Sequence, residues 1–155
     1  MYKHYDTDDE SISLHDCRAT KVIFENGILT FVFPDGIWST QDHPGNTTGR
    51  VLRTDRAEVQ FHLELGNESD ITLYVFREKW KKTVREEWPL TKLMEGVNSG
   101  KYSLEFLYQY KGYHARIIEC CLWSEQKPYH RECEIKLSLK GMTYGWNWLC
   151  EDKEW

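Results

Sequence analysis

The sequence predicts a mainly β protein, an antiparallel β-sandwich or barrel of eight to nine strands with one short helix. Three observations lead to this prediction. Short segments of alternating apolar and polar residues recur along the chain, turn signals separate them, and few segments have helical spacing. We interpret residues 1–155 as a single domain, in which the acidic and polar residues 1–13 are expected to be flexible.

The clearest local pattern is a hairpin around Asn26-Gly27. This dipeptide is the strongest two-residue turn signal, and apolar-rich segments, 20–25 and 28–33, flank it. A two-residue turn here places Phe24 opposite Leu29. One face of the predicted hairpin is therefore almost entirely apolar.

The middle of the chain predicts further strands and the helix. Residues 56–65 alternate apolar and polar without a break, as in a half-exposed antiparallel strand. After a turn, residues 71–77 are expected to form the next strand. The charged segment 77–88 has apolar residues at even spacing, which we interpret as a hairpin or edge strand. Pro89 then opens a short amphipathic helix, whose apolar stripe runs from residue 90 to 97.

The segment 113–123 is predicted to be a central strand, because neither of its alternating faces is polar from residue 117 to residue 123, apart from Glu119. If Lys111-Gly112 forms the turn before it, Glu119 shares a face with the tyrosines of the preceding strand. Arg116 then lies on the opposite face, within reach of Glu105. Two last strands are expected at residues 132–140 and 143–149, where the alternation resumes.

Composition excludes several classes of protein. The net charge is -5 and the isoelectric point is about 5.7, which disfavours a nucleic-acid partner. No apolar run reaches the length of a membrane span, so we expect no membrane partner. The first ten residues lack the apolar core of an export signal, and the five cysteines are odd in number. We therefore expect reduced thiols and a cytoplasmic location.

Few residues have the spacing that catalysis or metal binding requires. We expect no metal and no cofactor, because the pairs His15/Cys17 and His130/Cys133 do not follow the spacing of zinc ligands. No serine lies in a nucleophile turn, and no glycine-rich loop precedes a helix. Glu119 is the one candidate catalytic residue, since a carboxylate on an apolar face has to be paired, hydrogen-bonded or protonated.

The tryptophans suggest a different kind of site. Most of them lie in or beside loops, where aromatic side chains mark binding surfaces or close the ends of a sandwich. The longest segment without periodicity, residues 39–50, follows the first of these tryptophans and contains a histidine. The predicted binding residues are Trp38, His43, Trp146 and Trp148.

Three segments resemble parts of a known group of proteins. They are His15-Asp16-Cys17, the strand that leads to Phe33-Pro34-Asp35-Gly36, and Tyr144-x-Trp146-Asn147. These segments are similar to the ends of small uncharacterised bacterial β-rich proteins, some of which are immunity-protein-like. The resemblance implies a protein that binds another protein without catalysis, and it assigns no catalytic residue.

The sequence thus predicts a non-enzymatic binding protein with a protein partner and an interaction surface around residues 38–50. The alternative is a small-molecule-binding β-barrel or enzyme that uses Glu119 in an interior cavity. A cavity of several hundred Å³ that contains this carboxylate would favour the alternative.

Overall fold

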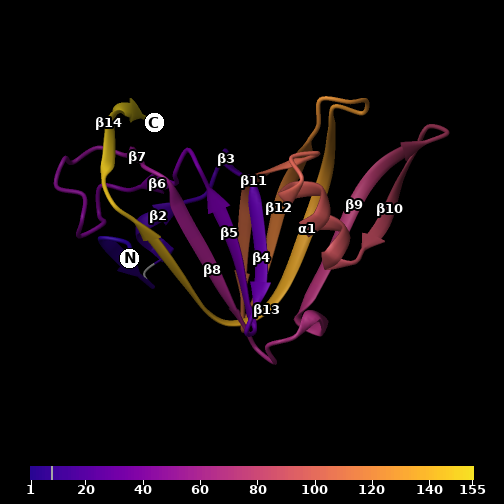
Figure 1. Ribbon diagram of the computed structural model, residues 1–155, viewed down its shortest axis with the longest axis horizontal. Coiled ribbons are helices and arrows are strands. Elements are labelled where there is room, and N and C mark those ends of the chain that lie inside the picture. The colour runs from indigo at the N-terminus through magenta and orange to yellow at the C-terminus, as the bar shows by residue number, and fades with distance from the viewer. Residues whose placement is uncertain (8) are drawn as a thin grey trace.

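The computed structural model describes residues 1–7 and 9–155, which form two antiparallel sheets and one α-helix (Figure 1). Among these residues, nine strands have five residues or more, in agreement with the predicted eight to nine. The strands are β1 (His4–Asp6), β2 (Ile12–Ser13), β3 (Cys17–Ala19), β4 (Lys21–Glu25), β5 (Ile28–Phe33), β6 (Trp38–Ser39), β7 (Leu52–Thr54), β8 (Ala57–Leu63), β9 (Ile71–Lys79), β10 (Lys82–Trp88), β11 (Ser103–Gly112), β12 (Ala115–Trp123), β13 (His130–Trp146) and β14 (Leu149–Glu154); the helix is α1 (Leu90–Asn98).

The long strand β13 joins the two halves of the ten-stranded sheet. Its first half pairs with β12 and β9, and its second half pairs with β8 and β1. The register with β8 shifts between Leu139 and Gly141, which marks a bulge where the strand passes from one half to the other. The prediction of two separate strands, 132–140 and 143–149, is wrong because the chain pairs continuously through Lys140 up to Trp146.

The core lies between the two halves, which face each other. Phe106 of β11 packs edge-to-face against Phe31 and Phe33 of β5, with ring centroids 5.0 and 5.2 Å apart. All three rings are buried. The order β3-β11-β12-β13-β8-β5-β4 does not close on itself, so the predicted mainly β fold is confirmed in its sandwich form and not as a closed barrel.

A second, four-stranded sheet covers one end of the molecule. Its order is β14-β7-β6-β2, so it joins the last strand of the chain to strands that lie within residues 12–54. In Figure 1 it lies on the opposite side from α1. The described residues of the segment 1–13, which was predicted to be flexible, include β1 and β2, paired with β13 and β6; residue 8 lies outside the described residues.

The local predictions for the two hairpins are confirmed. Asn26-Gly27 joins β4 and β5, and Phe24 pairs with Leu29. Both turn residues have positive φ, 52° and 75°, as this type of turn requires. The charged segment forms the hairpin of β9 and β10, which turns at Trp80-Lys81.

The predicted helix is also confirmed, and it packs beside the edge strand β4. Pro89 is its N-cap residue rather than its first helical residue. Asn98, the last helical residue, binds the main chain of β4 through both ends of its amide: the Val22 N–H donates to Oδ1 and Nδ2 donates to the Val22 carbonyl, each at 2.8 Å. The side chain thus occupies part of an edge that would otherwise lack a partner. No helix within the described residues is long and apolar enough to cross a membrane.

The turn before β12 differs from the prediction. The chain reverses at Tyr113-His114, and Gly112 pairs with Ala115, so Lys111-Gly112 belongs to β11. His114 has a φ of 51°, a conformation that histidine tolerates better than most residues. A further register shift between Phe106 and Tyr108 marks a bulge in β11.

The bulge in β11 determines which side chains of β12 face the core. β12 is central, between β11 and β13, as predicted. Arg116 and Ile118 are buried on its inner face, whereas Ile117 and Glu119 are only half-buried on its outer face. The expectation that both faces of this strand are covered is therefore wrong.

Candidate functional site

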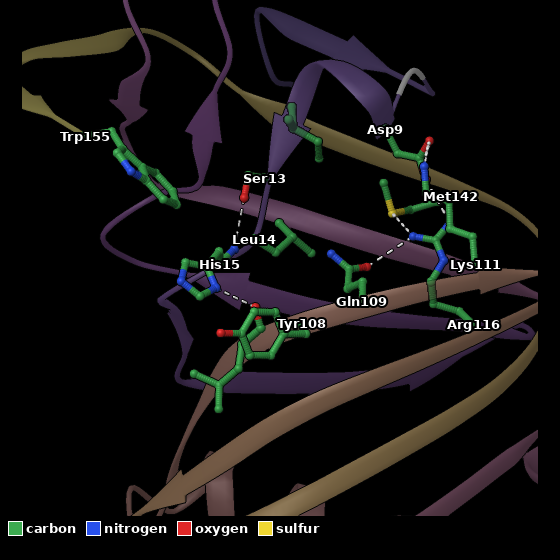
Figure 2. Close-up of a pocket in the computed structure, with 12 residues that line it drawn as sticks. Asp9, Ser13, Leu14, His15, Tyr108, Gln109, Lys111, Arg116, Met142 and Trp155 are labelled. Atoms are coloured by element: carbon green, nitrogen blue, oxygen red, sulfur yellow. Dashed lines mark hydrogen bonds and ion pairs between the residues drawn. The ribbon is translucent and has the colours of Figure 1, made fainter.

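A groove lies beside β11 where its neighbour β3 ends. β3 pairs with β11 only over Leu104–Phe106, and among the described residues no strand pairs with that side of β11 further along. The segment Ile12–His15 runs opposite the unpaired part of β11. A cavity of about 420 Å³ remains between them (Figure 2).

Arg116 lines this groove and is 7% exposed. Its Nη1 donates to Gln109 Oε1 at 3.1 Å, and its Nη2 donates to Asp9 Oδ2 at 2.8 Å. The Nζ of Lys111 lies 3.0 Å from the other carboxylate oxygen of Asp9. The Nε of Arg116 is buried and has no hydrogen-bond partner among residues 1–7 and 9–155. The groove therefore contains a buried cation whose hydrogen-bonding capacity is not fully used.

Two pKa shifts describe the electrostatics of this cluster. Burial alone would raise the pKa of Asp9, but the hydrogen bonds from Lys111 and Arg116 outweigh burial and hold this pKa below its usual value of 3.8. Burial would lower the pKa of Lys111, but its hydrogen bonds to Glu10 and Asp9 outweigh burial and raise this pKa above 10.5. At neutral pH both side chains are charged, so the groove presents a hydrogen-bonded array of charges.

Aromatic side chains line the other end of the groove. The ring of His15 lies 5.3 Å from that of Tyr108 and 5.6 Å from that of Trp155, and Trp155 packs edge-on against Trp38 at 5.0 Å. A carbonyl can only accept, so Nδ1–H of His15 donates to the Leu107 carbonyl, at 2.6 Å. This bond holds the imidazole near Tyr108 and Trp155, as Figure 2 shows.

The four predicted binding residues lie in different environments. Trp38 is half-buried beside the groove; its Nε1 donates to the His15 carbonyl at 3.0 Å, and the guanidinium of Arg53 lies 4.6 Å from the centre of its ring. Trp148 is 63% exposed. His43 and Trp146 are buried in the core. The structure thus brings only Trp38 next to the groove.

The buried environment of His43 shows what the loop of residues 39–50 does. The Gly45 N–H donates to Nδ1 at 2.9 Å, so Nε2 carries the ring hydrogen and donates to the Tyr144 hydroxyl at 3.0 Å. Asn46 is also buried, and its Nδ2 donates to the carbonyls of Thr40 and Arg50. The loop is thus anchored to the core by its polar side chains.

Glu119 does not line the groove. It pairs with Tyr108 on one side and with Glu134 on the other, on the outer face of the sheet. The prediction that Glu119 shares a face with Tyr108 is correct, but that face is not the core face, because an unpredicted bulge lies between Phe106 and Tyr108. The alternative function requires a cavity that contains Glu119, whereas the groove beside β11 is lined by Arg116 and not by Glu119.

Three of the five thiols are poor nucleophiles. Burial raises the pKa of Cys17 to about 12 and also raises the pKa of Cys120 and Cys121 above the usual 9.0. These three thiols are therefore protonated at neutral pH, and the thiolate is the reactive form. Within the described part of the chain, no group of three or more His, Cys, Asp and Glu side chains is arranged to hold a metal ion.

Thiol titration tests this burial pattern. Cys150 is the only partly exposed cysteine of the five, and the other four are buried. In the native protein, one equivalent of thiol should react rapidly with an aromatic disulfide reagent, and the other four thiols should react only after unfolding. In a Cys150→Ser variant, no thiol should react rapidly. Rapid reaction of two or more thiols in the native wild-type protein would contradict this pattern.

Sequence reasoning missed Arg116, Gln109 and Tyr108 as a group. Arg116 was assigned to Glu105, because the predicted register places those two side chains diagonally. A signal for the correct turn was present in His114, which tolerates positive φ. The contact between Arg116 and Asp9 joins residues 107 positions apart, and no local pattern indicates it.

The fold and the site define a mainly β, antiparallel protein with an open, aromatic and charged groove at one sheet edge. Comparisons with protein-family models, with curated proteins and with solved structures found no match to this chain. The resemblance to bacterial immunity-like proteins therefore stays a prediction from short segments.

Proposed function

We propose that this chain is a non-catalytic binding protein that holds an extended segment of a protein partner in the groove beside β11. The observation that carries the proposal is the unpaired side of β11 in a groove with an aromatic rim. Extended peptides commonly bind by adding to such an edge, where the main chain supplies affinity and side-chain pockets supply specificity.

The chemistry of the lining supports a polypeptide ligand. Tyr, Trp and Arg are the residues that most often dominate binding energy at protein interfaces, and Tyr108, Trp155 and Arg116 all line this groove. Gln109 and Lys111 add polar groups near the open strand. A bound segment would meet apolar, hydrogen-bonding and charged groups in turn.

The same proposal places the protein in the cytoplasm of a bacterial cell. The five cysteines are free, which favours a reducing compartment. The immunity-like resemblance of the three short segments supports the bacterial source. The protein partner would then be another protein that is made in, or delivered to, the same cell.

Selection from a random peptide display library tests the proposal with peptides of many different sequences. Peptides selected on the wild-type protein should bind a Tyr108→Ala variant at least about tenfold more weakly, as expected for a hot-spot residue. A Tyr129→Ala variant is the matched control, because Tyr129 is also exposed but does not line the groove. It should bind the selected peptides as the wild type does.

Two results would overturn the proposal. One is the absence of any peptide enriched above an empty support. The other is equal binding of the selected peptides to wild-type protein and to Tyr108→Ala, with both proteins melting at the same temperature.

A further inference from the structure

A second exposed feature lies far from the groove, at the tip of the hairpin of β9 and β10. β9 pairs with β13 only over Ile71–Val75, so the rest of the hairpin pairs only with itself. All residues from Arg77 to Thr83 are exposed. Figure 1 shows the hairpin projecting beyond the body of the molecule, with its turn at the far end.

Trp80 occupies the turn and is 90% exposed. An exposed tryptophan at such a tip contributes nothing to the core. Trp80 and Lys81 both have positive φ, 51° and 65°, in a two-residue turn where asparagine and glycine are the favoured residues. Strain of this kind at an exposed position points to a function for the side chains that cause it.

Positive charge is concentrated at the same tip. Lys79, Lys81 and Lys82 surround Trp80, and none of these lysines forms an ion pair within the described residues. The cations nearer the body have partners. Arg77 pairs with Glu86 at 3.1 Å, and Arg85 lies 4.1 Å above the ring of Tyr74.

We propose that this tip, comprising Lys79, Trp80, Lys81 and Lys82, contacts the surface of an anionic lipid bilayer. Tryptophan is the side chain most enriched, with tyrosine, at membrane–water interfaces, and lysines near an anionic surface add attraction. A projecting tip can reach a planar surface without a complementary shape. The absence of a membrane-crossing segment, on which the sequence prediction of no membrane partner rests, does not bear on a contact of this kind.

The distribution of charge favours a bilayer over the other polyanions. A nucleic-acid strand that continued past the tip would meet Glu78, Glu86 and Glu87 along the hairpin. A protein partner would need several hundred Å² of contact around the tryptophan, whereas this tip offers one aromatic side chain on a narrow turn. A flat surface that touches only the tip meets tryptophan and three lysines, whereas Glu78 lies at the margin of the tip, where its carboxylate accepts a hydrogen bond from Thr83.

Co-sedimentation with vesicles tests the proposal on the full chain. The wild type should bind vesicles of phosphatidylcholine with about a third phosphatidylserine, and hardly bind vesicles of phosphatidylcholine alone. Replacing any one of the three tip lysines with glutamine should weaken vesicle binding about fivefold. Trp80→Ala should weaken it roughly tenfold or more.

Two further variants make the result specific. Tyr113→Ala removes a side chain that is 93% exposed at another hairpin tip, and this variant should bind as the wild type does. The double variant Trp80→Asn, Lys81→Gly replaces the strained turn by a favourable one. It should bind more weakly and yet melt roughly 2–4 °C higher, because it relieves the strain of the turn.

Several results would overturn the proposal. They are no binding of the wild type to the anionic vesicles, equal binding to both kinds of vesicle, or unchanged binding by Trp80→Ala. Tip-dependent binding of a single-stranded oligonucleotide or of soluble polyglutamate, without binding to vesicles, would equally reject a bilayer as the partner.

Discussion

A Gly36→Ala variant is expected to unfold with a free energy about 4 kcal/mol lower than that of the wild type. Gly36 ends the turn after β5, and its φ is +80°. An added Cβ would lie 2.0 Å from the carbonyl oxygen of Thr54 and 2.5 Å from that of Asp55. Both atoms are main chain and cannot rotate away, so β7 or the turn has to move.

Gly49→Ala is the matched control. Gly49 also has a positive φ, +70°, but a Cβ there would meet nothing within 4 Å. This variant should lose only about 1 kcal/mol, the cost of the left-handed conformation itself. Urea unfolding monitored by tryptophan fluorescence measures both values. Equal losses for the two variants would show that the close approach at Gly36 has no energetic consequence.

Asp9→Asn is expected to lower the free energy of unfolding by about 2 kcal/mol at pH 7. Removing one partner of a fully buried ion pair costs roughly 3–5 kcal/mol, and the side chain of Asp9 is 21% exposed, which reduces that cost. The change leaves Arg116 buried with Lys111 nearby and no carboxylate between the two cations. The effect should therefore come mainly from an uncompensated buried charge.

Arg116→Met is the matched comparison and should cost less, about 1 kcal/mol. Methionine fills much of the volume of the arginine stem, and Asp9 keeps its ion pair with Lys111. The double variant should lose less than the sum of the two single losses, since the two side chains interact directly. A larger loss for Arg116→Met than for Asp9→Asn would contradict this description of the cluster.

The pH dependence of stability provides a separate check on Asp9. Its pKa is lower in the folded protein than the usual 3.8, so it stabilises the fold above that pH. This contribution is lost as the pH falls below 3.8 and passes through the lower folded pKa. Asp9→Asn should lack this part of the acid dependence, and titration of its unfolding free energy between pH 5 and pH 2, roughly, tests that expectation.

Short-range signals were sufficient where structure depends on neighbouring residues. Asn26-Gly27 predicts its hairpin because both turn residues tolerate positive φ, and the register follows from a two-residue turn. The alternation of residues 57–63 appears in the structure as alternate burial along β8. The helix from Leu90 to Asn98 is likewise indicated by its own apolar stripe.

The candidate site depends on contacts between distant segments. The bulge between Phe106 and Tyr108 puts these two residues on opposite faces of β11, so Tyr108 and its neighbour Glu119 lie on the outer face and Arg116 lies on the inner face. A shift of one residue moves every later side chain of a strand to the other face, so one unpredicted bulge is enough to reverse which face of β12 is expected in the core. The length of β13 also depends on contacts between distant segments, because pairing with β8 makes the second half of β13 a continuation of the same strand.

By itself the sequence determined the mainly β class, the positions of the Asn26-Gly27 hairpin and the helix, and the exposed charge around Trp80. Each of these follows from residues close together in the chain, whose backbone preferences and apolar spacing act locally. Only the tertiary structure decided that the two halves of the sheet share β13 and that Arg116 meets Asp9 beside an unpaired strand edge. Those features depend on which strands pair and in which register, and distant residues settle both.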